Sequence, residues 1–116
     1  MDKDAVLAVI DRFGKALERR GVRIARMILF GSYATGKFHD GSDIDLVVVS
    51  DDFQGRDYWQ RLDILDDALL EIWKPIEATP MTSEEWERGD STIVQFARNG
   101  EVVFESEDLR VGHGSF

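Results

Sequence analysis

Apolar residues recur at helical spacing in two long segments of the chain. In the first segment, one face is formed by Val6, Val9, Ile10, Phe13 and Leu17. This pattern predicts an amphipathic helix over residues 4–20, which Gly21 would end. In the second segment, spacings of four and three residues alternate along Tyr58, Leu62, Leu65, Leu69 and Ile72. They predict a long helix over residues 56–73 that ends before Pro75.

Short apolar runs predict the β-strands. They cover residues 24–30, 44–50, 76–79 and 101–104. The second run has a β-branched centre, Val47–Val49, and its continuous apolarity favours a strand that is covered on both faces. Two shorter helices are expected between the last two strands, one that begins at Thr82 and one through Ile93–Arg98. Helices that alternate with short strands indicate an α/β or α+β layer fold.

The composition is that of one globular domain. The chain has 116 residues, of which 43% are apolar, enough for a single core. We expect one domain over residues 1–108 and a flexible, Gly-rich tail over residues 109–116. The absence of cysteine excludes a disulfide framework and a thiolate metal site. No segment resembles a membrane span or a signal peptide, so we expect a cytoplasmic location without membrane binding.

The charge of the chain limits its partners. There are 23 acidic and 14 basic residues, which gives a formal net charge of −9. Proteins that hold nucleic acid non-specifically need clustered Lys and Arg, so this mode of binding is not expected. A basic protein surface is the macromolecular partner that an acidic domain favours.

A glycine-rich motif first suggests a P-loop. In the segment FGSYATGKF, residues 30–38, the glycines and Lys37 have the Gly-x-x-x-x-Gly-Lys spacing of P-loop NTPases. In those proteins the next residue is Ser or Thr, whose hydroxyl holds magnesium. Here it is Phe38, whose ring cannot ligate a metal, and the chain is short for a doubly wound sheet. The sequence therefore argues against a P-loop.

Two aspartates at the start of a predicted strand suggest a metal site. Asp43 and Asp45 are two residues apart, so their side chains project from the same face. Adjacent like charges repel unless a cation lies between them, and Mg²⁺ prefers oxygen ligands. Gly31 and Ser32, which end the preceding strand, would offer backbone N–H groups and a hydroxyl to phosphates, and a helix opening at Ser32 would add its N-terminus. For either aspartate alone, a turn or a solvated strand residue is the better interpretation, but the combination favours a phosphate-and-metal site.

The segment GSYATGKFHDGSDIDL, residues 31–46, resembles the signature of minimal nucleotidyltransferases in the DNA polymerase beta superfamily. That signature is Gly-Ser, a loop, and Asp-x-Asp followed by an apolar residue. The resemblance implies the nucleotidyltransferase fold, a small mixed sheet of three to five strands flanked by helices. It also implies Mg²⁺-dependent transfer of a nucleoside monophosphate from an NTP to an acceptor hydroxyl, with pyrophosphate leaving. By this resemblance Gly31 and Ser32 bind the triphosphate, and Asp43 and Asp45 bind the metal.

The same resemblance assigns a third carboxylate to Glu77, on the next core strand. Three acids could hold two ions, one near the attacking oxygen and one on the leaving phosphates, and Glu77 is also a candidate general base. Two departures from the family pattern bear on activity. Glu77 stands where Asp is usual, and Thr35 stands where Arg is common, which leaves Lys37 as the candidate phosphate-binding cation. An exposed acid on an edge strand is an equally good interpretation of Glu77.

The leading functional hypothesis is a nucleotidyltransferase that moves AMP from ATP to a hydroxyl on a separate protein. Domains of this kind resemble the antitoxin of a toxin–antitoxin pair whose partner is an all-helical HEPN-family protein. The alternative is a catalytically weak binding module that neutralises such a partner by occlusion. A third hypothesis is transfer to a small molecule such as an aminoglycoside, which would need a dimer to complete the acceptor site. Base preference, the acceptor and the oligomeric state, including a homo-oligomer, stay open at this point.

Most aromatic residues are assigned to packing. Trp59 and Trp73 flank the apolar face of the long helix and are expected to pack along it, and Trp86 is expected to support the helix that follows. Tyr33 is a candidate for stacking on an adenine base, although nothing in the sequence selects it. His39 lies in a polar loop, where a solvated side chain is the better interpretation than a catalytic one.

Overall fold

The computed structural model describes residues 1–39 and 41–106. Its elements are α1 (Lys3–Arg19), β1 (Arg26–Phe30), α2 (Ser32–Thr35), β2 (Ile44–Val49), the 3-10 helix η1 (Asp51–Phe53), α3 (Tyr58–Ile72), β3 (Ile76–Met81), α4 (Ser83–Arg88), α5 (Thr92–Ala97) and β4 (Glu101–Glu105). Every predicted helix and strand is present, with ends that shift by one or two residues, whereas η1 was not predicted. The tail expected over residues 109–116, with the end of the expected domain 1–108, lies outside the described residues.

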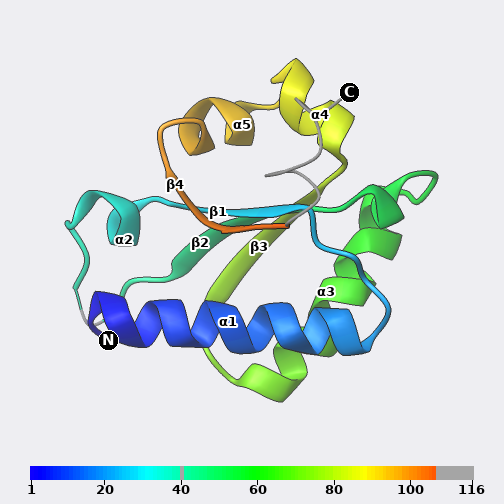
Figure 1. Ribbon diagram of the computed structural model, residues 1–116. Helices are drawn as coiled ribbons and strands as arrows, with labels where there is room; N and C mark the ends of the chain where they lie inside the picture. The colour runs from blue at the N-terminus through cyan, green and yellow to red at the C-terminus, as the bar shows by residue number, and fades with distance from the viewer. Residues whose placement is uncertain (40, 107–116) are drawn as a thin grey trace.

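The strands form one four-stranded sheet in the order β3-β2-β1-β4 (Figure 1). β1 runs antiparallel to both β2 and β4, whereas β2 and β3 are parallel. A parallel pair needs a crossover connection, and α3 supplies it between β2 and β3. The sheet is therefore mixed, as the resemblance implied, and β2 lies in its interior.

Helices cover both faces of the sheet. α1 and α3 lie side by side on one face, and α4 and α5 lie on the other (Figure 1). Successive side chains of β2 enter two different cores, with Leu46 and Val48 packed under α1 and α3 and with Val47 and Val49 packed against α5. This arrangement confirms the prediction of a strand covered on both faces. Each fully buried aliphatic side chain contributes about 1.5–3 kcal/mol to the fold.

Local signals fix the ends of the helices. Asp57 and Gln60 form a capping box at the start of α3, and Thr82 and Glu85 form a second one at the start of α4. The start predicted at Thr82 is therefore confirmed, because its hydroxyl accepts a hydrogen bond from the Glu85 amide. α3 ends where Trp73 adopts a left-handed conformation with φ 57°. Within the described residues, no helix combines the length and apolarity needed to cross a membrane.

The prediction that two tryptophans pack along α3 is wrong. Trp59 is 72% exposed and Trp73 is 82% exposed. The buried residues of α3 are Leu65, Ala68 and Ile72. Because a helix repeats every 3.6 residues, Trp59 falls on the opposite side, which faces solvent. Trp73 follows the end of α3 in its left-handed conformation and also faces solvent. Trp86 does pack, as expected, against the core that contains α5.

Candidate active site

Asp45 and Glu77 lie side by side in the structure. They are register partners in the parallel pair formed by β2 and β3. Both occupy the sheet face that carries α4 and α5, since side chains alternate along a strand and Leu46 enters the core on the other face. Asp43 directly precedes β2, and its charge acts on Asp45. The three acids predicted from the sequence therefore lie at the same end of the sheet.

The acids differ in their exposure to solvent. Asp45 is half-buried, whereas Asp43 and Glu77 are exposed. β3 is an edge strand, so Glu77 matches the alternative interpretation of an exposed edge acid. Its position beside Asp45 is nevertheless the one that the family resemblance implied for a third carboxylate. Exposure and proximity together leave Glu77 accessible to a ligand that also contacts Asp45.

Burial and neighbouring acids raise the pKa of Asp45 from 3.8 to about 6. Burial is the largest cause, and the charge of Glu77, a hydrogen bond with its carboxyl group and the charge of Asp43 add to it. A nearby cation would stabilise this carboxylate, because it offsets both the burial and the repulsion. Acids perturbed in this way are typical of functional sites.

Gly31 brings the phosphate-binding candidate loop against these acids. Phe30, the last residue of β1, pairs with Asp45 across the sheet, and Gly31 follows it with φ 76°. A Cβ atom at Gly31 would overlap Asp45 Oδ2. Glycine is therefore required here both by its backbone conformation and by the close approach to the carboxylate. Ser32 comes next and begins α2, as expected, so its backbone N–H has no partner within the helix.

An aromatic stack holds the loop that follows Gly31. Tyr33 is only 1% exposed, and its ring stacks on Phe38 with a centroid distance of 4.6 Å and an interplanar angle of 23°. The candidate role of Tyr33 in stacking on adenine is therefore wrong, since the core already covers its ring. Sequence reasoning used Phe38 only to reject a P-loop and missed its packing role. The available signal was the aromatic residue at each end of the Ala-Thr-Gly-Lys turn.

Thr35 and Lys37, the two polar residues of this turn, differ in their contacts. The Thr35 hydroxyl lies 3.3 Å from the carbonyl oxygens of Gly31 and Ser32 and donates back to its own helix. Lys37 is exposed, and no hydrogen bond or ion pair joins its ammonium group to another residue that the structure describes. His39 is also exposed, and its Nδ1 accepts a hydrogen bond from the Gly41 amide. Lys37 is thus an exposed cation in the loop, with no ion-pair partner among the described residues.

The acids fit a divalent ion that is shared with a substrate. Among the described residues, no group of three His, Cys, Asp or Glu side chains is arranged to hold a metal ion. Magnesium is usually bound by one or two carboxylates together with substrate phosphates and water. Asp45 with a neighbouring acid meets that requirement, and the raised pKa of Asp45 marks where a cation would relieve charge. These carboxylates therefore suit a Mg²⁺ ion whose remaining ligands are phosphate oxygens of a substrate.

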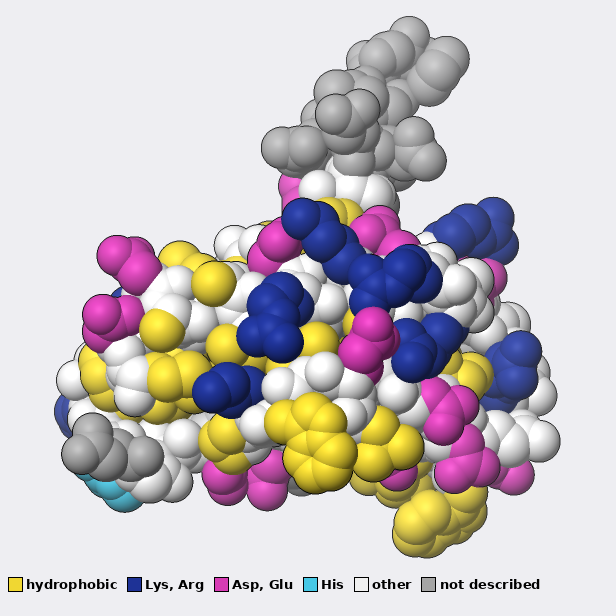
Figure 2. Space-filling model, turned by 90° about the horizontal axis from the view of Figure 1, so that it is seen from below, with side chains coloured by type: hydrophobic (Ala, Val, Ile, Leu, Met, Phe, Trp, Pro, Cys, Tyr) yellow, Lys and Arg dark blue, Asp and Glu magenta, His cyan; other side chains and the backbone are white. Residues whose placement is uncertain are grey.

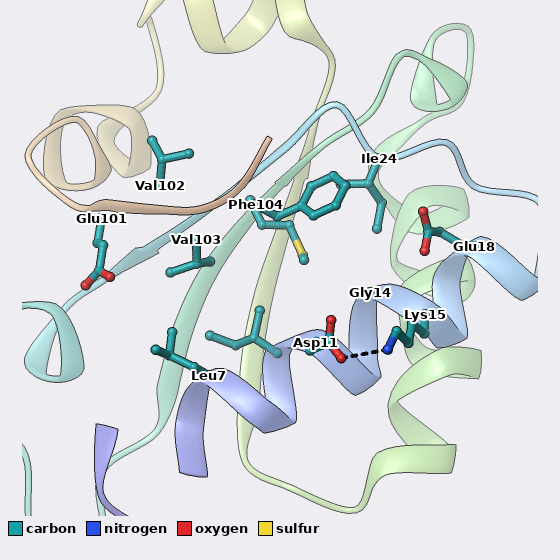
Figure 3. A pocket seen from close by; sticks show the side chains of 12 residues that line it. Leu7, Asp11, Gly14, Lys15, Glu18, Ile24, Glu101, Val102, Val103 and Phe104 are labelled. Carbon is teal, nitrogen blue, oxygen red and sulfur yellow. Dashed lines mark ion pairs between the residues drawn. The ribbon is translucent and has the colours of Figure 1, made fainter. Parts of the chain in front are cut away.

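A cavity of about 400 Å³ lies elsewhere, between α1 and β4 (Figure 3). Leu7, Val103 and Phe104 contribute apolar side chains to it, and an ion pair of 3.0 Å between Asp11 and Lys15 lies at its edge. None of the candidate site residues lines this cavity. A search for cavities would therefore not find the candidate active site, which is indicated instead by the grouping of its acidic side chains.

The chain belongs to the nucleotidyltransferase domain family, which it matches over residues 10–108. No curated protein matches it. A protein from Sulfolobus solfataricus assigned as a nucleotidyltransferase is 16% identical, with a TM-score of 0.71 over 90% of this chain and 85% of that one. A second solved structure assigned as a nucleotidyltransferase is 28% identical, with a TM-score of 0.54 over 76% of this chain and 90% of that one.

A third similar structure is a toxin–antitoxin determined with AMP-PNP. It is 20% identical, with a TM-score of 0.58 over 84% of this chain and 74% of that one. Similarity at this level shows the fold. Together with the family match, it confirms the nucleotidyltransferase fold and the resemblance that the segment 31–46 suggested, and it agrees with the rejection of a P-loop.

Proposed function

We propose that this domain transfers AMP from ATP to a hydroxyl group on a partner protein, with Mg²⁺ as its cofactor. The observation that carries the proposal is that Asp45 is paired with Glu77 on one side and closely approached by Gly31. The proposal is supported by the repulsion between the two acids, which a cation would relieve, and by the backbone turn at Gly31, which leaves room for phosphate oxygens. Membership of the nucleotidyltransferase family supports nucleotidyl transfer as the reaction class.

The loop residues would bind and orient the triphosphate. The backbone N–H groups of Gly31 and Ser32 and the Ser32 hydroxyl can donate to phosphate oxygens, since Gly31 has no side chain to block the approach. Lys37 would add a point charge on the exposed side of the turn. Thr35 would contribute little, because its hydroxyl already donates toward the backbone carbonyl groups of Gly31 and Ser32.

Asp43, Asp45 and Glu77 are the residues that would hold the metal, for which two ions are expected. When bound, the ions would supply neutralisation of the phosphates and activation of the acceptor hydroxyl. The acceptor oxygen forms a bond to the α-phosphorus, the bond to the bridging oxygen of pyrophosphate breaks, and the acceptor proton leaves. Glu77 is exposed beside Asp45, so it is placed to accept that proton.

ATP as donor and a protein as acceptor rest on separate grounds. The family resemblance favours ATP, and one similar structure was determined with AMP-PNP, an ATP analogue. The same similar structure is a toxin–antitoxin, which favours a partner protein as the carrier of the hydroxyl, such as an all-helical HEPN-family toxin. The net charge of −9 suits a basic partner surface.

A second candidate function is neutralisation of the partner by occlusion, without transfer. It is favoured by the absence, among the described residues, of a three-acid group arranged to hold a metal. It is also favoured by Thr35, which leaves the loop without the cation common in the family. The two functions differ in their dependence on Asp43, since only the enzyme needs that carboxylate.

The first test of the proposal is thermal unfolding with and without Mg²⁺ and ATP. A ligand at a hundred times its dissociation constant stabilises a fold by about 2.7 kcal/mol. For a domain of this size, that corresponds to an increase in melting temperature of roughly 10 °C. We expect the increase to need both Mg²⁺ and ATP and to disappear in Asp43→Asn. Asp66→Asn is the matched control, because Asp66 is an exposed aspartate on α3, which lies on the other face of the sheet.

The second test follows transfer directly. The domain is incubated with Mg²⁺, ATP labelled on the α-phosphate and its co-purified partner, and labelled protein is then sought. Label that appears on the partner with the wild type and not with Asp43→Asn supports the enzyme. Neutralisation of the partner that survives Asp43→Asn, with no label transferred, supports occlusion instead and contradicts the proposal.

A further inference from the structure

The solvent face of α3 carries large apolar side chains that nothing in the described chain covers. Trp59, Leu70 and Trp73 are 72%, 65% and 82% exposed. Together with two acids they form a row that we call the α3 stripe, which consists of Trp59, Asp63, Asp66, Leu70 and Trp73. Trp59, Asp63, Asp66 and Leu70 are spaced by four and three, so they share one side of α3, opposite its buried face. Trp73 follows directly after the last residue of the helix and extends the row at its end. The fourteen steps from Trp59 to Trp73, at 1.5 Å each, give the stripe a length of about 21 Å.

The acids of the stripe carry unneutralised charge. Among the described residues, Asp63, Asp66 and the neighbouring Asp67 take part in no ion pair. Glu71, one turn further along α3, is by contrast paired with both Arg19 and Arg20 of α1. The ion pairs between α1 and α3 therefore do not use the three aspartates. Their negative charge remains available to a cationic partner.

An open hollow of about 640 Å³ lies beside the stripe, between α1 and α3. It is lined by Arg20, Ile64, Asp67, Leu70 and Glu71. Figure 2 views the molecule from the side of α1 and α3: Lys and Arg side chains cross the middle of this face, and apolar and acidic side chains lie along its lower edge. Exposed apolar residues rimmed by polar ones mark interaction sites, and tryptophan is prominent among the residues that dominate binding energies.

The position of the α3 stripe relative to Asp45 and Glu77 decides whether a partner bound there would cover the candidate active site. α3 covers the sheet face opposite to Asp45, so a partner on the stripe would leave the candidate active site open. Trp73, at the end of the stripe, is only four residues before Glu77, and four residues span at most about 14 Å. A partner that lies along the stripe would therefore end close to the site without covering it.

We propose that the α3 stripe is the docking surface for an amphipathic helix of the partner protein, with an apolar face flanked by Lys or Arg. A helix is the fitting occupant because the stripe is straight and spans about four turns, so side chains of a second helix can pack along it. Lys and Arg suit the three aspartates, which form no ion pair with any residue that the structure describes. The inference rests on the proposed function only in that a partner exists, since docking here needs neither nucleotide nor the paired acids.

Two synthetic peptides of matched length test the docking surface. Both are helical with leucine at helical spacing, and they differ in carrying either Lys or Glu beside the leucines. Binding is followed by isothermal titration calorimetry at physiological salt, without nucleotide or Mg²⁺. The wild type is expected to bind the Lys peptide and not the Glu peptide. Trp73→Ala and the double variant Asp63→Asn/Asp66→Asn are each expected to weaken binding roughly tenfold or more.

The matched control is Asp4→Asn/Glu87→Gln, which removes the same charge from exposed residues outside the stripe. It is expected to bind like the wild type. Equal weakening in the control and in Asp63→Asn/Asp66→Asn, or no binding to either peptide, would overturn the proposal. Sedimentation would also overturn it if the wild type were a dimer that Trp73→Ala dissociates, because the occupant would then be a second copy. Peptide binding without any effect of ATP on unfolding would leave the docking surface standing and contradict the proposed enzyme instead.

Discussion

Replacement of Asp45 by Asn should stabilise the ligand-free domain at neutral pH. The pKa of Asp45 is raised from 3.8 to about 6, so the folded state binds this proton more tightly than the unfolded state. The resulting stability is fully present below pH 3.8 and is lost as pH rises through about 6. Above that pH the ionised carboxylate is a cost to the fold. Asparagine has nearly the same shape and does not carry that cost.

The magnitude follows from the pKa and the partial burial of the side chain. A change from 3.8 to about 6 would correspond to about 3 kcal/mol for a fully buried group. Asp45 is half-buried, so solvent screening reduces the expected difference to about 1 kcal/mol. The melting temperature of Asp45→Asn at pH 7.5 should then exceed that of the wild type by about 4 °C.

Urea unfolding in the presence of EDTA, at pH 7.5 and at pH 4, measures the effect. The two proteins should differ at pH 7.5 and converge at pH 4. Asp52→Asn is the matched control with the opposite sign, because hydrogen bonds from Arg23 lower the pKa of Asp52 and stabilise its ionised form. That variant should be less stable than the wild type at pH 7.5. An Asp45→Asn variant that is less stable than the wild type at both pH values would refute the reasoning.

Three further substitutions test single features. Gly31→Ala should cost more than about 1–3 kcal/mol, because φ 76° with ψ −152° is a conformation that essentially only glycine adopts and because the added Cβ would also overlap the neighbouring carboxylate. Gly36→Ala should cost only the roughly 1–2 kcal/mol of a left-handed backbone in the same urea assay, because Gly36 has φ 80° and nothing lies within 4 Å of the added Cβ. Thr82→Ala should lower the free energy of unfolding by about 1 kcal/mol, because it removes a cap, while Ser83→Ala should have little effect. Tyr33→Phe should unfold at the same temperature or higher, because the buried hydroxyl it removes has no hydrogen-bond partner among the described residues; a lower melting temperature would contradict this.

Elements with a clear apolar period were predictable from the sequence. The apolar residues from Val6 to Leu17 have the spacing of a helix, and α1 forms there with these residues buried. The apolar run of β2 could only be a strand with cover on both sides, and its alternate residues do enter two cores. Spacing alone also placed Gly31 and Asp45 in one candidate site, since a strand, a turn and a strand bring their ends together.

Features set by tertiary contacts were not predictable. The pairing of Asp45 with Glu77 depends on the register of a parallel pair, which the crossover through α3 sets and no local pattern encodes. Trp59 and Trp73 were wrongly expected to pack along α3. Leucines on either side of its buried face made the apolar face look wider in the sequence than it is in the structure. Tyr33 was judged by its chemistry, whereas its stack on Phe38 forms only once the turn between them closes.

The two acids that pair across the sheet differ in how firmly the backbone holds them. β2 is bonded to β1 on one side and to β3 on the other, whereas β3 pairs only with β2 among the described residues. Amides of β2 should therefore exchange with deuterium only on global unfolding, and amides of β3 should exchange through local opening. A ligand that bridges Asp45 and Glu77 ties the edge strand to the centre of the sheet. Slower exchange confined to β3 is thus a signature of an occupied site that requires no turnover.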